Sequence, residues 1–256
     1  IDTAPGYVTV GAKTIEDRRN LGRVSLTTIL ARSSNVGATK LAMSLQPDQL
    51  WQTMTRFGLG TLTSSAFPGE SAGLLTHFSN WKPISQATLA YGYGISVTAL
   101  QLAQAYAVLG NSGRMNPVSM VALEAPLEGE QVVAPDTAAA VRRMLEEVVR
   151  PGGTGTKAAV AGYRVAGKTG TAWKFAAGGY SEDKYMSIFA GLAPASDPQL
   201  AAVVVIDEPS GELYYGSDVA APVFAEVMTE SLRLLAVPPD ALPARDPGSI
   251  MQAMSR

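Results

Sequence analysis

The sequence predicts an α+β fold in which helices flank an antiparallel sheet. Three observations favour it. Helical periodicity of the hydrophobic residues dominates the first half of the chain and returns near its end. Three strand-like segments lie in the second half, at 165–172, 185–193 and 200–206, and a short proline-bounded turn joins the last two. Helices and strands that are segregated along the chain in this way are typical of α+β proteins.

Length and composition indicate a globular protein. The chain has 256 residues, of which 46% are hydrophobic and 16% charged, so it can bury a full core. The net charge is −2 and the basic residues are scattered, so we expect no nucleic-acid partner. No apolar run reaches the roughly 18–20 residues that cross a bilayer. No signal peptide is evident and the chain begins with Ile1, so we expect an upstream part that this sequence does not include.

The absence of cysteine and the presence of one histidine restrict the chemistry. Thiol catalysis, disulfides and thiolate metal sites are excluded. A zinc site or a Ser-His-Asp triad would have to use His77, which lies in a polar and aromatic loop, and we expect it to be a packing residue. The sequence therefore predicts no metal and no cofactor.

The first part of the chain combines a connecting arm with two helices. Residues 1–20 contain turn residues and short alternating pieces, which are typical of an arm. Helical runs follow at 24–30 and 36–45, and the cluster from Ser33 to Asn35 separates them. Serine and asparagine commonly cap exposed amides at such junctions, so capping alone could explain the cluster.

The middle of the chain alternates helices with glycine-rich segments. A helix at 48–57 starts after Pro47, and a long surface loop is expected at 59–80. A helix at 99–109 follows a segment in which glycines flank two tyrosines, including Tyr93. The glycines favour tyrosines that line an open cleft, although both rings could equally belong to the core.

The second half carries the strands and two further helices. Residues 115–123 are predicted to form a short strand and 135–149 a helix. The glycine-rich segment 152–157 lacks the spacing of a phosphate-binding loop, so we do not assign it that function. A last helix is predicted from Pro222 to Leu235, and residues 238–256 are predicted to form a mobile tail after a domain at 1–237.

The strand at 165–172 is the strongest candidate for a functional site. Side chains alternate along a strand, so Lys168 and Gly170 share one face while Thr169 and Thr171 share the other. A cation, two hydroxyls and an open backbone position could bind an anionic substrate. The alternative is an edge strand with a solvated lysine and two threonines of high β-propensity.

Together, Ser33 to Asn35, the segment from Tyr91 to Thr98 and the strand Lys168 to Thr171 resemble the transpeptidase domain of class B penicillin-binding proteins. The similarity is greatest to the division-specific kind, of the penicillin-binding protein 3 type, and covers about Val24 to Val237. It implies the penicillin-binding protein and serine β-lactamase-like transpeptidase fold. Each motif is weak alone, but their order and context make the resemblance specific.

The resemblance implies roles for particular residues. Ser33 would pass protons between the base and the leaving amine, and Asn35 would bind the substrate amide. Lys168 would keep the site positive. Thr169 and Thr171 would bind the terminal carboxylate of a D-Ala-D-Ala stem peptide, with the Thr171 amide in the oxyanion hole, and Gly170 would contact the substrate backbone. Tyr93 would line the cleft, and Tyr214 or Tyr215 would form its aromatic wall.

One part of the family pattern is missing. The nucleophile motif Ser-x-x-Lys should precede Ser33, and nothing there fits it. Two matches elsewhere, at 79–82 and 181–184, fall in the wrong order and in predicted loops, so we regard them as accidental. The sequence is therefore expected to be the C-terminal part of a transpeptidase domain, without its nucleophile, membrane anchor and pedestal.

The function implied is serine-type D,D-transpeptidation, which crosslinks peptidoglycan stem peptides during septal cell-wall synthesis and is inhibited by covalent β-lactams. The location implied is the periplasmic side of the inner membrane, with cell-division membrane proteins as partners. Two alternatives stay open, a β-lactam sensor module and a catalytically silent fragment that acts through binding. A β-lactamase is disfavoured because no evident carboxylate is placed to activate a deacylating water.

Overall fold

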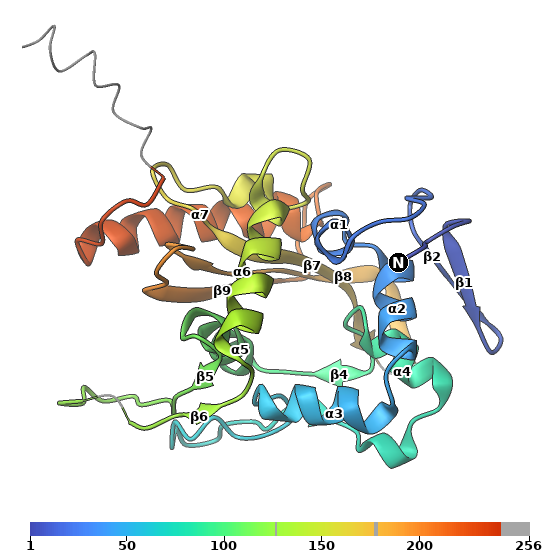
Figure 1. Ribbon diagram of the computed structural model, residues 1–256, viewed down its shortest axis with the longest axis horizontal. Helices are drawn as coiled ribbons and strands as arrows, with labels where there is room; N and C mark the ends of the chain where they lie inside the picture. The colour runs from blue at the N-terminus through green and yellow to red at the C-terminus, as the bar shows by residue number, and fades with distance from the viewer. Residues whose placement is uncertain (126, 177–178, 242–256) are drawn as a thin grey trace, which may run out of the picture.

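The computed structural model describes residues 1–125, 127–176 and 179–241. Its centre is an antiparallel sheet of three strands in the order β7-β8-β9 (Figure 1). The strands are β7 (Ala166–Ala176), β8 (Gly179–Ala193) and β9 (Leu200–Asp207). The predicted α+β class and all three predicted strands are confirmed, and β8 begins earlier than expected because it pairs with the far end of β7.

Alternation along β8 explains how the sheet packs on both faces. Phe189 is fully buried toward helix α7 (Gly216–Leu234), where its ring lies 4.6 Å from that of Phe224. Leu192 points the opposite way, into a cluster with Leu145 of α6 (Pro135–Val149) and Leu109 of α5 (Ala99–Gly110). Figure 1 shows α7 along one side of the sheet and α5 along the other. The predicted helix at 135–149 is confirmed with the same bounds.

The predicted helices of the first part are also confirmed. They are α1 (Leu26–Arg32), α2 (Asn35–Met43) and α3 (Pro47–Arg56). The hydroxyls of Ser25 and Ser34 accept the capping hydrogen bonds of α1 and α2. The capping explanation of the serine cluster is therefore correct for Ser34.

Residues 1–20 are more than a connecting arm. They contain the hairpin β1 (Tyr7–Val10) and β2 (Lys13–Glu16), whose Val10 and Ile15 form a buried cluster with Ala87. Ala87 belongs to α4 (Pro83–Leu89), a helix that the periodicity did not predict. Only two buried residues of the hairpin contribute to this cluster, so the short alternating pattern was too weak to reveal it.

The expected loop at 59–80 contains short regular elements. These are β3 (Leu74–Leu75), which pairs with β4 (Ile95–Ser96), and the 3-10 helix η1 (Phe78–Asn80). His77 caps η1, and its ring packs edge-on against that of Trp51 at 4.8 Å. The interpretation of His77 as a packing residue is therefore confirmed.

Two predicted element boundaries in the second half are wrong. The strand expected at 115–123 is reduced to β5 (Arg114–Met115), paired with β6 (Glu130–Gln131). Pro117 has no backbone N–H to donate to the neighbouring strand, so the strand ends before it. Helix α7 begins at Gly216 rather than Pro222, because its first turns already bury Ala220 and Ala221 against the core. This packing outweighs the break that an internal proline introduces.

The beginning of the predicted mobile tail is fixed to the domain. Asp240 accepts hydrogen bonds from the backbone N–H of Arg164 (2.7 Å) and the hydroxyl of Ser196 (2.6 Å). The Ala241 N–H donates to the Gly162 carbonyl at 3.0 Å. The tail prediction is therefore wrong for residues 238–241, and its remainder, 242–256, lies outside the described residues. Within the described part of the chain, no helix has the length and apolar character of a membrane span.

Gly216 lies where α7 begins against the backbones of β7 and β8. A methyl group there would overlap the carbonyl oxygens of Gly170 and Ile188. These backbone atoms cannot rotate away, so we expect Gly216→Ala to lower the free energy of unfolding by about 3 kcal/mol. Urea unfolding checks this, with Gly211→Ala as the matched control because the nearest atom to its added methyl is 3.9 Å away. Equal stability of the two variants would contradict the prediction.

Candidate functional site

Ser33 and Lys168 meet although 135 residues separate them. Ser33 ends α1 in the left-handed conformation, with φ of 55°, and its side chain is exposed. The Lys168 ammonium donates to Ser33 Oγ at 2.9 Å and to the Thr169 carbonyl oxygen at 2.9 Å. Two motifs that the sequence analysis singled out separately therefore form one site.

Burial lowers the pKa of Lys168 to about 8. The side chain retains some solvent exposure beside Ser33. Among the residues that the structure describes, no carboxylate forms an ion pair with Lys168. Near pH 7 Lys168 is therefore mostly a cation whose hydrogen-bond partners are neutral oxygens, which favours an anionic ligand beside it.

Asp17 holds the junction between α1 and α2. The buried Ser34 hydroxyl donates to Asp17 Oδ2 at 2.5 Å and accepts from the Gly37 N–H at 2.9 Å. The Val36 N–H donates to Asp17 Oδ1 at 3.1 Å. These bonds set the direction of the chain on both sides of Ser34, and so position Ser33 and Asn35. Sequence reasoning missed Asp17 because it lies 17 residues before its partner.

The two threonines of β7 are on the opposite face from Lys168, as the alternation predicted. Thr169 Oγ1 lies 3.0 Å from Thr154 Oγ1, and either hydroxyl could be the donor. Thr171 Oγ1 accepts a hydrogen bond of 2.9 Å from the Gly216 N–H. Both threonines line a cavity of about 540 Å³.

This site cavity lies between residues 16–21, the α1–α2 junction, residues 152–154, β7 and the start of α7. Of the predicted site residues, it is lined by Ser33, Asn35, Thr169, Thr171 and Tyr215. Its lining also includes residues that the sequence analysis missed, among them Asp17, Arg18, Arg32, Thr154 and Asp218. The cavity thus combines hydroxyl, amide and cationic groups with the carboxylates of Glu16, Asp17 and Asp218. Its hydroxyl, amide and guanidinium groups could bind an anionic peptide end.

The structure places one of the two candidates for the aromatic wall in the site cavity. Tyr215 lines the site cavity, and the guanidinium of Arg18 lies 4.7 Å from the centre of its ring. Tyr214 lies outside the lining and stacks on Tyr185 at 4.0 Å. A hydrogen bond from its hydroxyl to Tyr215, together with desolvation, raises the pKa of Tyr214 to about 12. Of these two neighbours, only Tyr215 therefore forms a wall of the cavity.

Tyr93 and Gly170 also lie outside the lining of the site cavity. The Tyr93 hydroxyl accepts from the Trp173 N–H at 3.1 Å, farther along β7, and its ring packs edge-on against Tyr180. A methyl group added to Gly170 would lie 3.4 Å from Ile188 of the neighbouring strand. Ile188 belongs to the same sheet, so the open side of Gly170 inferred from the sequence does not face the site cavity.

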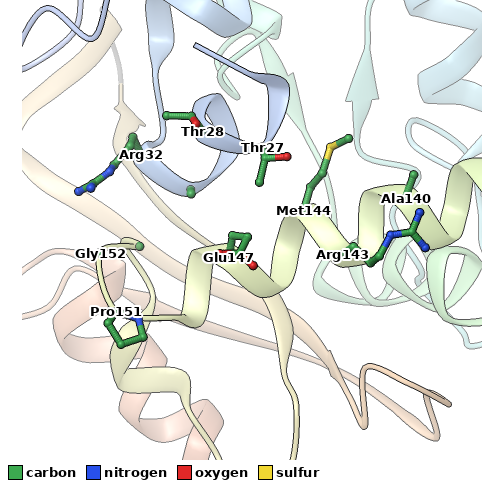
Figure 2. Close-up of a pocket in the computed structure, with 11 residues that line it drawn as sticks. Thr27, Thr28, Arg32, Ala140, Arg143, Met144, Glu147, Pro151 and Gly152 are labelled. Atoms are coloured by element: carbon green, nitrogen blue, oxygen red, sulfur yellow. The ribbon is translucent and has the colours of Figure 1, made fainter.

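A second cavity of about 540 Å³ lies between α1 and α6 (Figure 2). Figure 2 shows Met144 extending from α6 toward α1 beside Thr27. This cavity shares Arg32, Gly152 and Gly153 with the site cavity but contains none of the predicted site residues. Five of the predicted site residues line the site cavity, whereas Lys168 lies outside its lining and contacts it through Ser33.

Neither formal Ser-x-x-Lys match reaches the site cavity. Ser79 lies in η1, and its hydroxyl lies 2.8 Å from His77 Nδ1. Ser181 to Lys184 lie within β8, so the prediction of a loop there is wrong. The Lys184 ammonium pairs with Glu208 at 3.1 Å. In the described parts of the chain, no group of three or more His, Cys, Asp or Glu residues could hold a metal ion.

Comparisons with known proteins identify relatives of this chain. The family model for the penicillin binding protein transpeptidase domain matches residues 1–229. The chain is 44% identical over 232 residues to the peptidoglycan D,D-transpeptidase FtsI of Escherichia coli K12, covering 91% of this chain and 40% of that protein. It is 41% identical over 230 residues to a probable peptidoglycan D,D-transpeptidase PenA of Neisseria flavescens, covering 90% of this chain and 58% of that protein.

A solved structure agrees with these sequence relatives. The apo transpeptidase domain of Burkholderia pseudomallei penicillin-binding protein 3 superimposes with a TM-score of 0.89 at 41% identity. The match covers 95% of this chain and 74% of that one. The chain thus spans about 40–60% of the length of these curated relatives.

Proposed function

Because the chain belongs to the penicillin-binding protein transpeptidase domain family, in its class B, we propose that it forms part of a peptidoglycan D,D-transpeptidase. The reaction is acyl transfer from the D-Ala-D-Ala end of one stem peptide to an amine of another. The observation that carries this proposal is the contact of Lys168 Nζ with Ser33 Oγ at 2.9 Å, beside the cavity that Thr169 and Thr171 line.

The site residues supply binding and proton transfer in this reaction. A serine nucleophile attacks the carbonyl carbon of the penultimate D-Ala and expels the terminal D-Ala, leaving an acyl-enzyme. Ser33 passes the serine proton to the leaving amine, and the Lys168 ammonium lowers the energy of the negative charge that develops. The acceptor amine then attacks the ester, which restores the serine.

The substrate is held by its two polar ends. The hydroxyls of Thr169 and Thr171 donate to the terminal carboxylate, and Asn35 hydrogen-bonds the amide of the peptide. The Thr171 N–H is one donor of the oxyanion hole. Hydrogen bonds to a charged group contribute about 1.5–3 kcal/mol each, so the two hydroxyls select for a free carboxylate.

The nucleophile comes from a segment that this sequence does not contain. No Ser-x-x-Lys match in the chain reaches the site cavity, and the chain covers 40% of its E. coli relative. We infer that the preceding segment also carries the membrane anchor, so that the enzyme acts at the periplasmic side of the inner membrane. The similarity to FtsI supports a role in septal synthesis with division proteins as partners, and β-lactams would acylate the same serine.

Intact mass spectrometry with a penicillin tests the proposal. A protein that extends this chain upstream should gain the mass of one drug molecule, whereas the 256-residue chain alone should gain none. Crosslinking of a stem-peptide thioester by the extended protein would separate a transpeptidase from a sensor, which is acylated but makes no crosslinks. An increment on the 256-residue chain would place the nucleophile within it and contradict the assignment.

A further inference from the structure

Thr154 connects the two elements that form the site. Its N–H donates to the carbonyl oxygen of Ala31, in the last turn of α1, at 3.2 Å. Its hydroxyl lies 3.0 Å from that of Thr169 on β7, and it lines the site cavity. The glycine-rich segment 152–157, to which no function was assigned from the sequence, thus contacts both the helix that ends at Ser33 and the strand that bears Lys168.

The segment around Thr154 is held in place on both sides. The N–H groups of Gly153 and Gly155 donate to the carbonyls of Arg150 (2.9 Å) and Val148 (2.8 Å) at the end of α6. Lys157 forms an ion pair of 2.7 Å with Asp218 in the first turn of α7. The hydroxyl of Thr154 is therefore presented to Thr169 from a fixed backbone.

The direction of the hydrogen bond between the two threonines depends on what occupies the cavity. A threonine hydroxyl has one proton to donate and can also accept, whereas a carboxylate only accepts. Thr171 already receives a hydrogen bond from the Gly216 N–H, which can only donate, so the Thr171 proton stays available. Thr169 gains the same arrangement only when Thr154 is the donor of their shared bond.

We propose that Thr154 is a positioning residue for the substrate carboxylate: its hydroxyl donates to Thr169 Oγ1 and leaves the Thr169 proton for the anion. The inference rests on the proposed function, since it needs a carboxylate in the site cavity. Hydrogen bonds arranged in such a chain strengthen one another. Thr154 therefore acts on the carboxylate end of the substrate and leaves the scissile amide unaffected.

Substrates with and without the carboxylate test this proposal in an enzyme that carries its nucleophile. We compare kcat/KM for a stem peptide ending in D-Ala-D-Ala with that for the same peptide ending in a carboxamide. Thr154→Val preserves the shape and the backbone bond to Ala31 but removes the hydroxyl. It should lower kcat/KM about three- to tenfold for the acid and less than about twofold for the amide. Thr154→Ser should restore the wild-type preference for the acid.

A double-mutant cycle tests whether Thr154 acts through the hydroxyl of Thr169. In a Thr169→Val background, Thr154→Val should cause no further loss on the acid, because the partner hydroxyl is already absent. Thr154→Ala is a second variant that lacks the hydroxyl. All rates are normalised to the fraction of the protein that a penicillin can acylate, so misfolded protein does not enter the comparison.

The possible failures can be distinguished. An equal loss on acid and amide, no loss on either, or additive effects in the cycle would each overturn the role of Thr154. A wild-type enzyme that a penicillin acylates, but that prefers neither peptide, would also overturn it while leaving the proposed acylation chemistry standing. A wild-type enzyme that is not acylated and turns over neither peptide would instead overturn the proposed function, and this inference with it.

Discussion

Replacement of Lys168 by alanine is expected to lower the rate of penicillin acylation by about 10²- to 10³-fold in a protein that carries the nucleophile. The Lys168 ammonium is the cation that contacts Ser33 Oγ, and its loss removes the positive charge beside the developing oxyanion. Stopped-flow acylation, with the acylated protein measured by intact mass, gives the rate. Full-rate acylation of Lys168→Ala would remove the assigned role.

The pKa of Lys168 predicts how this rate depends on pH. Burial lowers the pKa to about 8, so the ammonium form is lost as the pH rises through about 8. If the cation is the active form, acylation should fall on the alkaline side with an apparent pKa near 8. Lys168→Arg keeps a guanidinium that stays charged well above pH 8, so that variant should be slower at pH 7 but lack the alkaline fall near pH 8. If the acylation rate of Lys168→Arg still falls near pH 8, the fall is caused by the titration of another group.

Ser33 and Ser34 are neighbours, but we expect Ser33 to control the acylation rate and Ser34 to control stability. Ser33→Ala removes the oxygen that accepts from Lys168 and should slow acylation by about 10²- to 10³-fold, since proton transfer of this kind contributes about 10²–10⁴. Alanine tolerates the left-handed conformation of residue 33 about as poorly as serine does, so thermal stability should change little.

Ser34→Ala is the matched control. It removes the cap of α2 and leaves Asp17 without its hydroxyl partner, which should lower the free energy of unfolding by about 1–3 kcal/mol. The bond between Lys168 and Ser33 involves no atom of Ser34, so acylation per folded molecule should fall less than in Ser33→Ala. Urea unfolding and acylation kinetics on both variants check this. A larger loss of acylation in Ser34→Ala would show that the junction, and not the Ser33 hydroxyl, controls the rate.

Local patterns in the sequence were sufficient for most of the framework. Helix α6 has the predicted bounds because its apolar residues recur at helical spacing and Pro135 begins it. Strands β8 and β9 carry short continuous apolar segments, which are typical of strands that pack against helices. The side of β7 on which each residue lies followed from alternation alone, which put Lys168 opposite Thr169 and Thr171.

Elements that depend on distant partners could not be predicted locally. The hairpin β1–β2 and helix α4 are short, and each is stabilised by burying a few residues against the other. Helix α7 starts six residues before Pro222 because its first turns pack on the sheet, a contact that a local helix-breaking rule does not include. Residues 238–241 contain prolines, as a mobile tail would, yet Asp240 is bound by residues 44 and 76 positions away.

The sequence by itself determined the two chemical motifs and the main helices and strands, because each depends on residues close together in the chain. It also determined the family, because the order of the motifs along the chain is itself a property of the sequence. Only the tertiary structure decided that Ser33 and Lys168 touch, that Tyr215 rather than Tyr93 or Tyr214 lines the site cavity, and that Asp17 and Thr154 support the site. These contacts join segments whose separation in sequence bears no periodic signal. Their geometry arises when the helices pack on the two faces of the sheet.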